Sequence, residues 1–325
     1  MRLLNRFLYA LCVAFVKSLS TDFPSVDDAI EFSRLSGISY EIDPSAISDC
    51  SEIANAHPNL FYDDLQCLLF KPESNVLVVS SEVHNYVGIS YRGTTDTKDW
   101  ITDVRARLVT FGHDSQHPIA PKTFDVQVQD GFNIDDFKNY QEIHDVIVGV
   151  IAKKPETRIV VTGHSLGAAN SILCATALAT HLPDRFIESI SYASPLTGNV
   201  NWINYVNSLQ NLSVWRFVLM TDLIPRSPPF EEYRHPGHTI QLDKKRCKTY
   251  YLHYGDEELV YTGVPESWKS DSFHEMYRSI QMHHLDYYTE YITDKCAANP
   301  DVYYNLEFMQ PLHSADMDDT MIDIA

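Results

Sequence analysis

The sequence predicts an α/β fold in which helices cover a mostly parallel central sheet. Three observations support this prediction: short β-prone runs cluster early in the chain, apolar runs then alternate with helical patterns, and 325 residues suffice for one large core. Hydrophobic residues make up 44% of the chain and aromatic residues 12%, which is typical of a globular protein and excludes disordered and fibrous classes.

The first part of the chain predicts one helix followed by several strands. Residues 26–35 carry apolar side chains at helical spacing. Residues 65–70, 75–80 and 86–91 are short β-prone runs separated by turn residues. We therefore expect three adjacent strands that meander into a sheet.

From residue 132 the pattern changes to alternating helices and strands. Apolar positions at helical spacing predict the helices, and continuous apolar runs predict buried strands. In chain order we expect helix 137–151, strand 158–162, helix 166–181, strand 187–193, helix 202–209 and strand 214–220. This alternation predicts parallel strand pairing, and no linker or internal repeat divides the chain.

The two ends of the chain differ from this central part. An apolar run flanked by basic and small residues predicts a secretory signal peptide over residues 1–20, cleaved near Ser20-Thr21. The alternative is a retained signal anchor that keeps the protein in a membrane. Residues 313–325 hold four aspartates and neither lysine nor arginine, so we expect an acidic flexible tail. Residues 21–312 are then a single domain.

The charge balance limits the partners that the protein can bind. The chain has 25 basic and 44 acidic residues and a formal net charge of −19. A negative surface potential repels the phosphates of nucleic acid and of anionic lipids. We therefore expect no nucleic-acid partner, and no obligate protein partner is evident from the sequence.

Five cysteines follow the predicted signal peptide, so at least one of them is unpaired. Cys174 lies in a helical apolar pattern and is expected to be a buried free thiol. Cys50 with Cys67 and Cys247 with Cys296 could pair in an oxidising compartment, although the sequence leaves the connectivity open. No Cys or Cys/His spacing indicates a metal site, and we expect no cofactor.

The segment Gly163-His-Ser165-Leu-Gly167 fits the G-x-S-x-G pattern. That pattern needs a strand that ends at the first glycine and a helix that opens after the serine, and both are predicted here. Small residues at positions 163 and 167 relieve collisions around a serine held in a tight turn. The start of the helix directs N–H groups and its positive dipole end toward a developing negative charge.

A serine hydroxyl needs a base within hydrogen-bond reach and a carboxylate that orients this base. In α/β hydrolases these follow in the chain order Ser, Asp or Glu, His. Asp222 comes directly after a predicted strand, where open α/β sheets collect functional residues, although a turn-forming aspartate is the simpler interpretation. His283 and His284 both precede a helical segment, and both remain candidates for the base.

Five segments in order resemble the class 3 lipases, the fungal triacylglycerol lipase family with its feruloyl-esterase and plant relatives. The resemblance covers roughly residues 25–292 and implies an α/β-hydrolase fold. The segments are Tyr91-Arg-Gly-Thr94 followed by Trp100, Val128-Gln-Asp-Gly-Phe132, Val161-Thr-Gly-His-Ser-Leu-Gly-Ala168, Tyr192-Ala-Ser-Pro195 with Gly198-Asn199, and Thr221-Asp-Leu-Ile-Pro-Arg-Ser-Pro-Pro229.

The resemblance also implies roles for individual residues. Ser165 would be the nucleophile, Asp222 the orienting acid and His283 the base, because His283-His-Leu-Asp-Tyr-Tyr288 fits the family pattern H-x-L-x-x-Y. His284 is the alternative base. Backbone N–H groups of Thr94 and Leu166 would form the oxyanion hole. The family's short lid helix would fall between residues 95 and 102 with Trp100 as its anchor, although simple packing is the other interpretation of this tryptophan.

These observations predict a secreted serine esterase that hydrolyses carboxylic ester bonds of acylglycerols through an acyl-enzyme, and a lipid–water interface could serve as its partner. The alternatives are a phospholipase or a feruloyl-type esterase with the same machinery, and a catalytically inert lipid-binding protein on the same fold. Asn211-Leu-Ser213 is a glycosylation sequon, which suits a secreted chain, but it sits at the mouth of a predicted buried strand and the sequence leaves its occupancy open.

Overall fold

A computed structural model describes most of the chain between residues 24 and 293. The described residues are 24–62, 64–94, 107–112, 125–132, 139–219, 222, 224–228, 232–242 and 283–293. The predicted signal peptide, the lid segment with Trp100, the acidic tail, Cys247 and Cys296 lie outside them. Within these ranges no helix is both long enough and apolar enough to cross a membrane.

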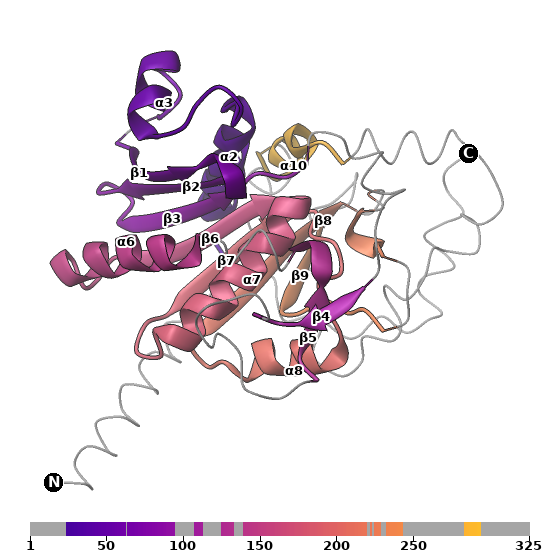
Figure 1. The fold of residues 1–325 in the computed structure, drawn as a ribbon. Helices are drawn as coiled ribbons and strands as arrows, with labels where there is room; N and C mark the ends of the chain where they lie inside the picture. Colours follow the sequence, from indigo (N-terminus) through magenta and orange to yellow (C-terminus); the bar gives the residue numbers. More distant parts are fainter. Residues whose placement is uncertain are drawn as a thin grey trace, which may run out of the picture.

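A seven-stranded sheet forms the centre of the described structure (Figure 1). Its spatial order is β1 (Gln66–Lys71), β2 (Val76–Ser81), β3 (Tyr86–Tyr91), β6 (Arg158–His164), β7 (Ile187–Tyr192), β8 (Leu212–Leu219) and β9 (His238–Leu242). The first three strands pair antiparallel, and every pair from β3 to β9 is parallel. The predicted mostly parallel α/β sheet, including the early meander, is therefore confirmed.

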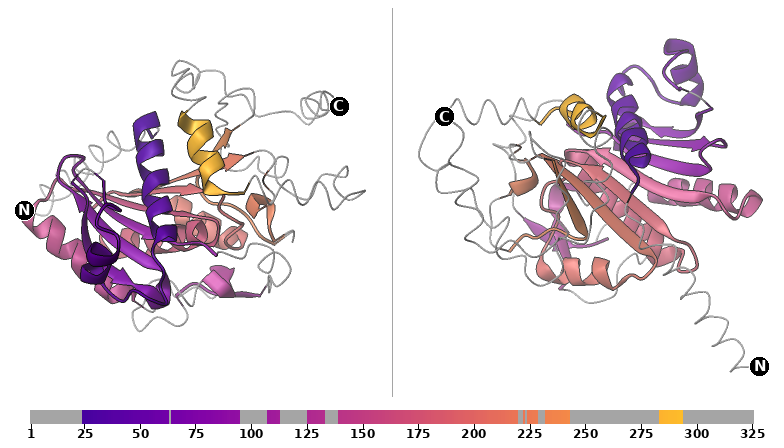
Figure 2. Two further views of the ribbon diagram at one scale, coloured as in Figure 1. Left: turned by 90° about the horizontal axis from the view of Figure 1, so that it is seen from above. Right: turned by 180° about the vertical axis from the view of Figure 1, so that it is seen from behind.

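Helices cover both faces of this sheet. α2 (Val26–Glu41) and α10 (Leu285–Tyr291) pack on one face, where they lie side by side (Figure 2). α7 (Leu166–His181) packs on the other face, whose apolar cluster also includes side chains of α6 (Tyr140–Lys153) and α8 (Val200–Ser208). The result is a three-layer α/β/α arrangement.

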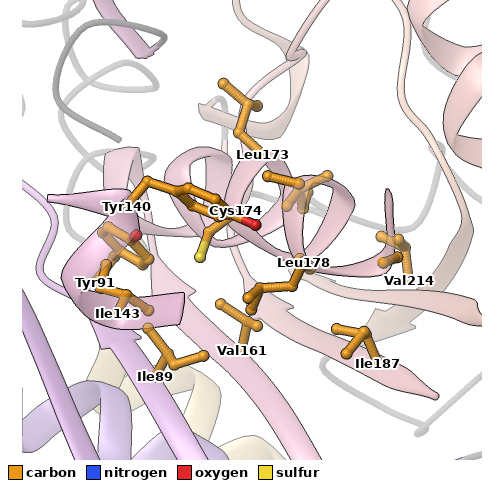
Figure 3. Packing of buried hydrophobic residues seen from close by; sticks show 14 of the residues in the cluster. Ile89, Tyr91, Tyr140, Ile143, Val161, Leu173, Cys174, Leu178, Ile187 and Val214 are labelled. Carbon is orange, nitrogen blue, oxygen red and sulfur yellow. The ribbon is translucent and has the colours of Figure 1, made fainter. Parts of the chain in front are cut away.

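Alternation along the strands divides the core between the two faces. In β6 the side chain of Val160 joins the cluster beneath α2 and α10, and the next residue, Val161, joins the cluster beneath α7. Figure 3 shows Val161 and its strand neighbour Ile89 close to Cys174 and Leu178 of α7. Because both faces are covered, successive residues of β6, Ile159, Val160 and Val161, are all apolar rather than alternating with polar residues.

Local sequence explains where two of the helices begin. Ser25 caps α2 with its hydroxyl, which accepts from the Asp28 N–H at 2.9 Å, and the Asp28 carboxylate accepts from the Ser25 N–H in return. α7 begins directly after Ser165 and is buried on almost every side, which is why its sequence lacks a polar face.

Several smaller elements were not predicted. They are the helix α3 (Cys50–Ala56), the 3-10 turns η1 (Pro72–Ser74) and η2 (Ile224–Arg226), the two-stranded sheet of β4 (Leu108–Thr110) and β5 (Gln127–Gln129), and strand β9. β9 has only two large apolar side chains, Ile240 and Leu242, and its length is five residues. Such a short alternation does not distinguish a strand from a loop until pairing with β8 satisfies its backbone.

The described cysteines follow the predicted pattern. Cys50 and Cys67 form a disulfide that joins α3 to β1, with their sulfur atoms 2.07 Å apart. Cys174 is buried in α7 and forms no disulfide with another described cysteine. The pairing of Cys50 with Cys67, left open by the sequence, is thus resolved in the folded chain.

Candidate active site

Ser165 occupies a sharp turn between β6 and α7. Its backbone has φ 60° and ψ −126°, a left-handed conformation that is rare for a residue with a Cβ and costs about 1–3 kcal/mol. Three backbone hydrogen bonds hold the turn. The Ser165 N–H donates to the Tyr192 carbonyl at 3.0 Å, and the Ser165 carbonyl accepts from the N–H groups of Ala168 at 3.0 Å and Ala169 at 3.4 Å. The strained turn is therefore supported by its neighbours on both sides.

Glycines at 163 and 167 make this turn sterically possible. A Cβ on Gly163 would overlap the backbone carbonyl of Gly167. A Cβ on Gly167 would overlap the carbonyl of Tyr91 at the end of β3. The close approach of β3, β6 and α7 around Ser165 thus requires the two glycines, for the reason that the G-x-S-x-G pattern predicts.

His283 lies next to Ser165 although 118 positions separate them in the chain. Its Nε2 is 2.8 Å from Ser165 Oγ, and its Nδ1 is 2.8 Å from Oδ2 of Asp222. A carboxylate only accepts hydrogen bonds, so Nδ1 carries the ring proton and Nε2 is free to accept from the serine hydroxyl. All three side chains are almost completely buried.

Asp222 is held by three further hydrogen bonds. Its own N–H donates to the carbonyl of Leu219, at the end of β8. Its Oδ1 accepts from the Ile224 N–H at 2.9 Å, and its Oδ2 also accepts from the Tyr288 hydroxyl at 2.6 Å. These contacts fix the direction in which the carboxylate faces His283.

The structure separates the two candidate bases. His284 is exposed and is the N-cap residue of α10, whereas His283 is buried against Ser165 and Asp222. The geometry therefore favours His283 and leaves His284 outside the cluster.

The two expected oxyanion donors lie on the segments that meet at Ser165. Leu166 is the first residue of α7, so its N–H has no acceptor within the helix. Thr94 follows Gly93, whose Cα faces Ser165 so closely that an added Cβ would come within 3.1 Å of the serine Cβ. Trp100, the expected lid anchor, lies outside the described residues.

Asn211 does not fit the expectation of a glycan. Its side chain is buried, and its amide nitrogen lies 2.9 to 3.1 Å from the carbonyl oxygens of Ala179, Leu182 and Arg185. A glycan is attached through this same nitrogen and is bulky. The folded structure therefore contradicts glycosylation at this sequon, because the amide ties the end of α7 to β8.

Three residues near the site had no assigned role in the sequence interpretation. Tyr288 was only part of the H-x-L-x-x-Y pattern, and its spacing of five from His283 is the signal that could have indicated a role. His164 was the variable position of the G-x-S-x-G pattern. Tyr40 carries no local signal, because its contacts are to residues distant in the sequence, Gly93 and His164.

The sheet order, the strand-to-helix turn at Ser165 and the positions of Asp222 and His283 after later strands define an α/β hydrolase. Residues 88–232 match the family described as Lipase (class 3). Over this segment the chain is similar to the class 3 lipases.

Several fungal proteins are similar to the chain. A secreted mono- and diacylglycerol lipase of Malassezia restricta is 29% identical over 178 residues, which is 54% of this chain and 58% of the relative. A lipase of Rhizomucor miehei is 25% identical over 251 residues, 74% of this chain and 60% of the relative. A secreted alkaline triacylglycerol lipase of Penicillium cyclopium is 26% identical, over 51% of this chain and 57% of the relative. The chain thus spans less than two thirds of the length of these relatives.

Solved structures agree with the fold. The Rhizomucor miehei triacylglyceride lipase superposes with a TM-score of 0.56 at 23% identity, covering 67% of this chain and 80% of that one. The Yarrowia lipolytica LIP2 lipase gives a TM-score of 0.55 at 21% identity, covering 68% of this chain and 80% of that one. At these identities the similarity establishes the α/β-hydrolase fold alone.

Proposed function

We propose that this protein is a secreted serine esterase of the lipase type that hydrolyses the carboxylic ester bonds of acylglycerols. One observation carries the proposal. A continuous chain of hydrogen bonds runs from Ser165 Oγ through both ring nitrogens of His283 to Asp222, with 2.8 Å at each step. This is the arrangement by which a serine hydroxyl becomes a nucleophile near neutral pH.

The reaction proceeds through an acyl-enzyme. Ser165 Oγ attacks the ester carbonyl carbon while His283 Nε2 takes the hydroxyl proton, and Asp222 stabilises the resulting imidazolium. The tetrahedral intermediate then breaks its bond to the alcohol oxygen, which leaves with the proton from His283. Water, deprotonated by His283, attacks the acyl-serine, and the carboxylic acid leaves as Ser165 recovers its proton.

The N–H groups of Thr94 and Leu166 stabilise the oxyanion in both steps. The N–H of Leu166 contributes because the first N–H groups of a helix have no acceptor within the helix and lie at the positive end of the helix dipole. Loss of one such donor lowers kcat about 10²- to 10³-fold. The lid anchored by Trp100 would cover this site in water, and residues 21–312 would form one domain.

Acylglycerols are the favoured substrates because similar proteins carry such names. The Malassezia restricta relative is named as a mono- and diacylglycerol lipase and the Penicillium cyclopium relative as a triacylglycerol lipase. Both are also named as secreted, which agrees with the signal peptide predicted over residues 1–20. The negative net charge of the chain disfavours anionic phospholipid surfaces.

A fluorophosphonate probe and p-nitrophenyl esters test the proposed nucleophile. We expect one covalent label on Ser165 of the wild type. In Ser165→Ala we expect no label and a fall in turnover of at least 10³-fold. Ser171→Ala is the matched control, because this buried serine lies on the same helix and its hydroxyl only donates to the Ala168 carbonyl at 2.8 Å. Unlabelled wild-type protein with normal folding would refute the esterase and favour an inert lipid-binding protein.

A second measurement identifies the substrate. Turnover of mono-, di- and triacylglycerols, a phosphatidylcholine and a feruloyl ester is compared below and above the concentrations at which the lipids aggregate. Preferred hydrolysis of acylglycerols supports the proposal. Preferred hydrolysis of the phospholipid or of the feruloyl ester would agree with the proposed mechanism but refute acylglycerols as the substrate class.

A further inference from the structure

The C-terminal turn of α2 reaches the back of the candidate active site. Tyr40, in the last turn of this helix, places its hydroxyl 2.9 Å from Nδ1 of His164. The other ring nitrogen of His164, Nε2, is 2.7 Å from the backbone carbonyl oxygen of His283. The His164 and His283 rings also lie against each other, with centroids 4.7 Å apart.

The direction of these hydrogen bonds follows from chemistry. A carbonyl oxygen only accepts, so Nε2 of His164 carries the ring proton and donates to His283. Burial, strengthened by the neighbouring imidazole of His283, holds the pKa of His164 well below its usual value, so the ring is neutral. Nδ1 of a neutral ring with a protonated Nε2 is an acceptor, and the Tyr40 hydroxyl is therefore its donor.

The Tyr40 hydroxyl also contacts the segment that carries Thr94. The phenol oxygen lies against the backbone of Gly93 and 3.5 Å from the carbonyl oxygen of His164. The approach is so close that a Cβ on Gly93 would overlap both this hydroxyl and the His164 carbonyl. One hydroxyl thus packs against the loop next to Thr94 and donates to the ring that holds the backbone of His283.

Polar contacts fix α2 in the position that this geometry requires. Ser36 Oγ is 2.9 Å from Thr162 Oγ1 of β6, and Ser39 Oγ is 2.5 Å from Ser90 Oγ of β3. After the helix, the Ile42 carbonyl accepts from the Arg92 guanidinium at 3.2 Å. These contacts connect the end of α2 to the strands that lead to Ser165 and Thr94.

We propose that Tyr40 and His164 are positioning residues that set the geometry of the base and of the oxyanion loop together. The inference rests on the proposed esterase function and deepens it. Ser165 Oγ pairs with His283, whereas Tyr40 and His164 pair with each other and with the His283 backbone. The Tyr40–His164 relay holds the His283 backbone at one end and packs against Gly93 at the other, so its loss displaces groups whose placement controls the rate.

The first test is Tyr40→Phe, which removes only the hydroxyl. We expect kcat for p-nitrophenyl esters and the rate of fluorophosphonate labelling to fall about tenfold to a hundredfold, with KM within about twofold of wild type. Tyr86→Phe is the matched control. The Tyr86 hydroxyl also reaches α2, where it donates to Glu31 at 2.6 Å, but it lies at the other end of β3 from the site. This control should retain wild-type kcat.

The second test addresses His164. In His164→Gln the side-chain amide nitrogen takes the place of Nε2 and keeps a donor for the His283 carbonyl, whereas His164→Leu has no donor. We expect the glutamine variant to retain more activity than the leucine variant. The double variant Tyr40→Phe/His164→Leu should lose no more activity than His164→Leu alone, because the two residues act as one unit.

A spectroscopic measurement separates positioning from general stability. ¹⁵N NMR of His164 should show a protonated Nε2 and an unprotonated Nδ1 in the wild type, and a changed Nδ1 signal in Tyr40→Phe but not in Tyr86→Phe. If wild type is labelled and Tyr40→Phe matches Tyr86→Phe in kcat, the relay is refuted while the esterase stands. Additive losses in the double variant would also refute it. Absence of label on wild-type protein would refute the esterase itself.

Discussion

Tyr288 donates a 2.6 Å hydrogen bond to Oδ2 of Asp222, the same carboxylate oxygen that lies 2.8 Å from Nδ1 of His283. The Tyr288 hydroxyl also accepts from the Leu219 N–H at 3.2 Å. Because α10 begins directly after His284, the helix that positions Tyr288 is continuous with the residue that supplies the candidate base. One short helix therefore orients both partners of the Asp222–His283 contact.

Tyr288→Phe is expected to lower kcat without unfolding the protein. A hydrogen bond to a charged group is worth about 1.5–3 kcal/mol, which corresponds to about a tenfold to hundredfold fall in kcat if the loss appears in the transition state. Tyr287→Phe is the control, because this neighbouring tyrosine is 37% exposed. Steady-state kinetics on p-nitrophenyl esters, with thermal unfolding of each variant, measures the difference. Equal kcat in the two variants would contradict the prediction.

Substitution of Gly167 tests the close approach around Ser165. Gly167→Ala is expected to destabilise the protein by about 1–3 kcal/mol and to lower activity, since the added Cβ overlaps the Tyr91 carbonyl. Gly149→Ala is the matched control on the exposed side of α6, where a Cβ meets nothing within 4 Å. The control should gain about 0.5–1 kcal/mol from better helix propensity. Urea unfolding measures both, and a tolerated Gly167→Ala would refute the steric argument.

Asn211 is expected to carry no glycan when the chain is expressed in a eukaryotic secretory system. Intact-mass measurement before and after N-glycosidase treatment should show no change at this site. Asn211→Leu should lose about 1–3 kcal/mol of stability, because buried carbonyls lose their donor. Gln210→Ala, at an exposed neighbouring position, should change stability little. A glycosylated, normally folded protein would contradict this prediction.

Stability is expected to fall as the pH drops below about 6.5. Burial lowers the pKa of His164 and His235 well below 6.5 in the folded protein, and the Arg216 guanidinium lowers that of His235 further. Below the unfolded pKa the unfolded chain binds more protons than the folded one, so the free energy of unfolding decreases with decreasing pH. The stabilisation that comes from keeping these two histidines neutral is complete above about pH 6.5, and it is lost as the pH falls toward their pKa values in the folded protein.

His235→Gln isolates one of these two groups. Its amide nitrogen can replace Nε2 as the donor to the Pro225 carbonyl, a 2.6 Å contact in the wild type, without adding a titrating group. Urea unfolding between about pH 7.5 and pH 5.5 should give a shallower pH dependence for the variant than for the wild type. Parallel curves would show that His235 does not contribute.

Periodicity and local motifs were sufficient for most of the elements and for the candidate nucleophile Ser165. The helices and strands from β6 to β8 were predicted because buried apolar runs and helical spacing are local signals. Ser165 was predicted because a tight strand-to-helix turn requires small residues on either side of the serine, and the five residues 163–167 provide them as glycines. Asp222 followed from its place after an apolar strand.

The remaining features depend on residues that meet only in the folded chain. The choice of His283 over His284 required the position of α10 against the sheet. The disulfide pairing of Cys50, the burial of the Asn211 amide and the contacts of Tyr40 likewise join segments that the sequence keeps apart. Hydrophobic patterning is a property of neighbours along the chain, whereas hydrogen-bond partners and charge environments are set by which elements pack together, and only the tertiary structure decides that.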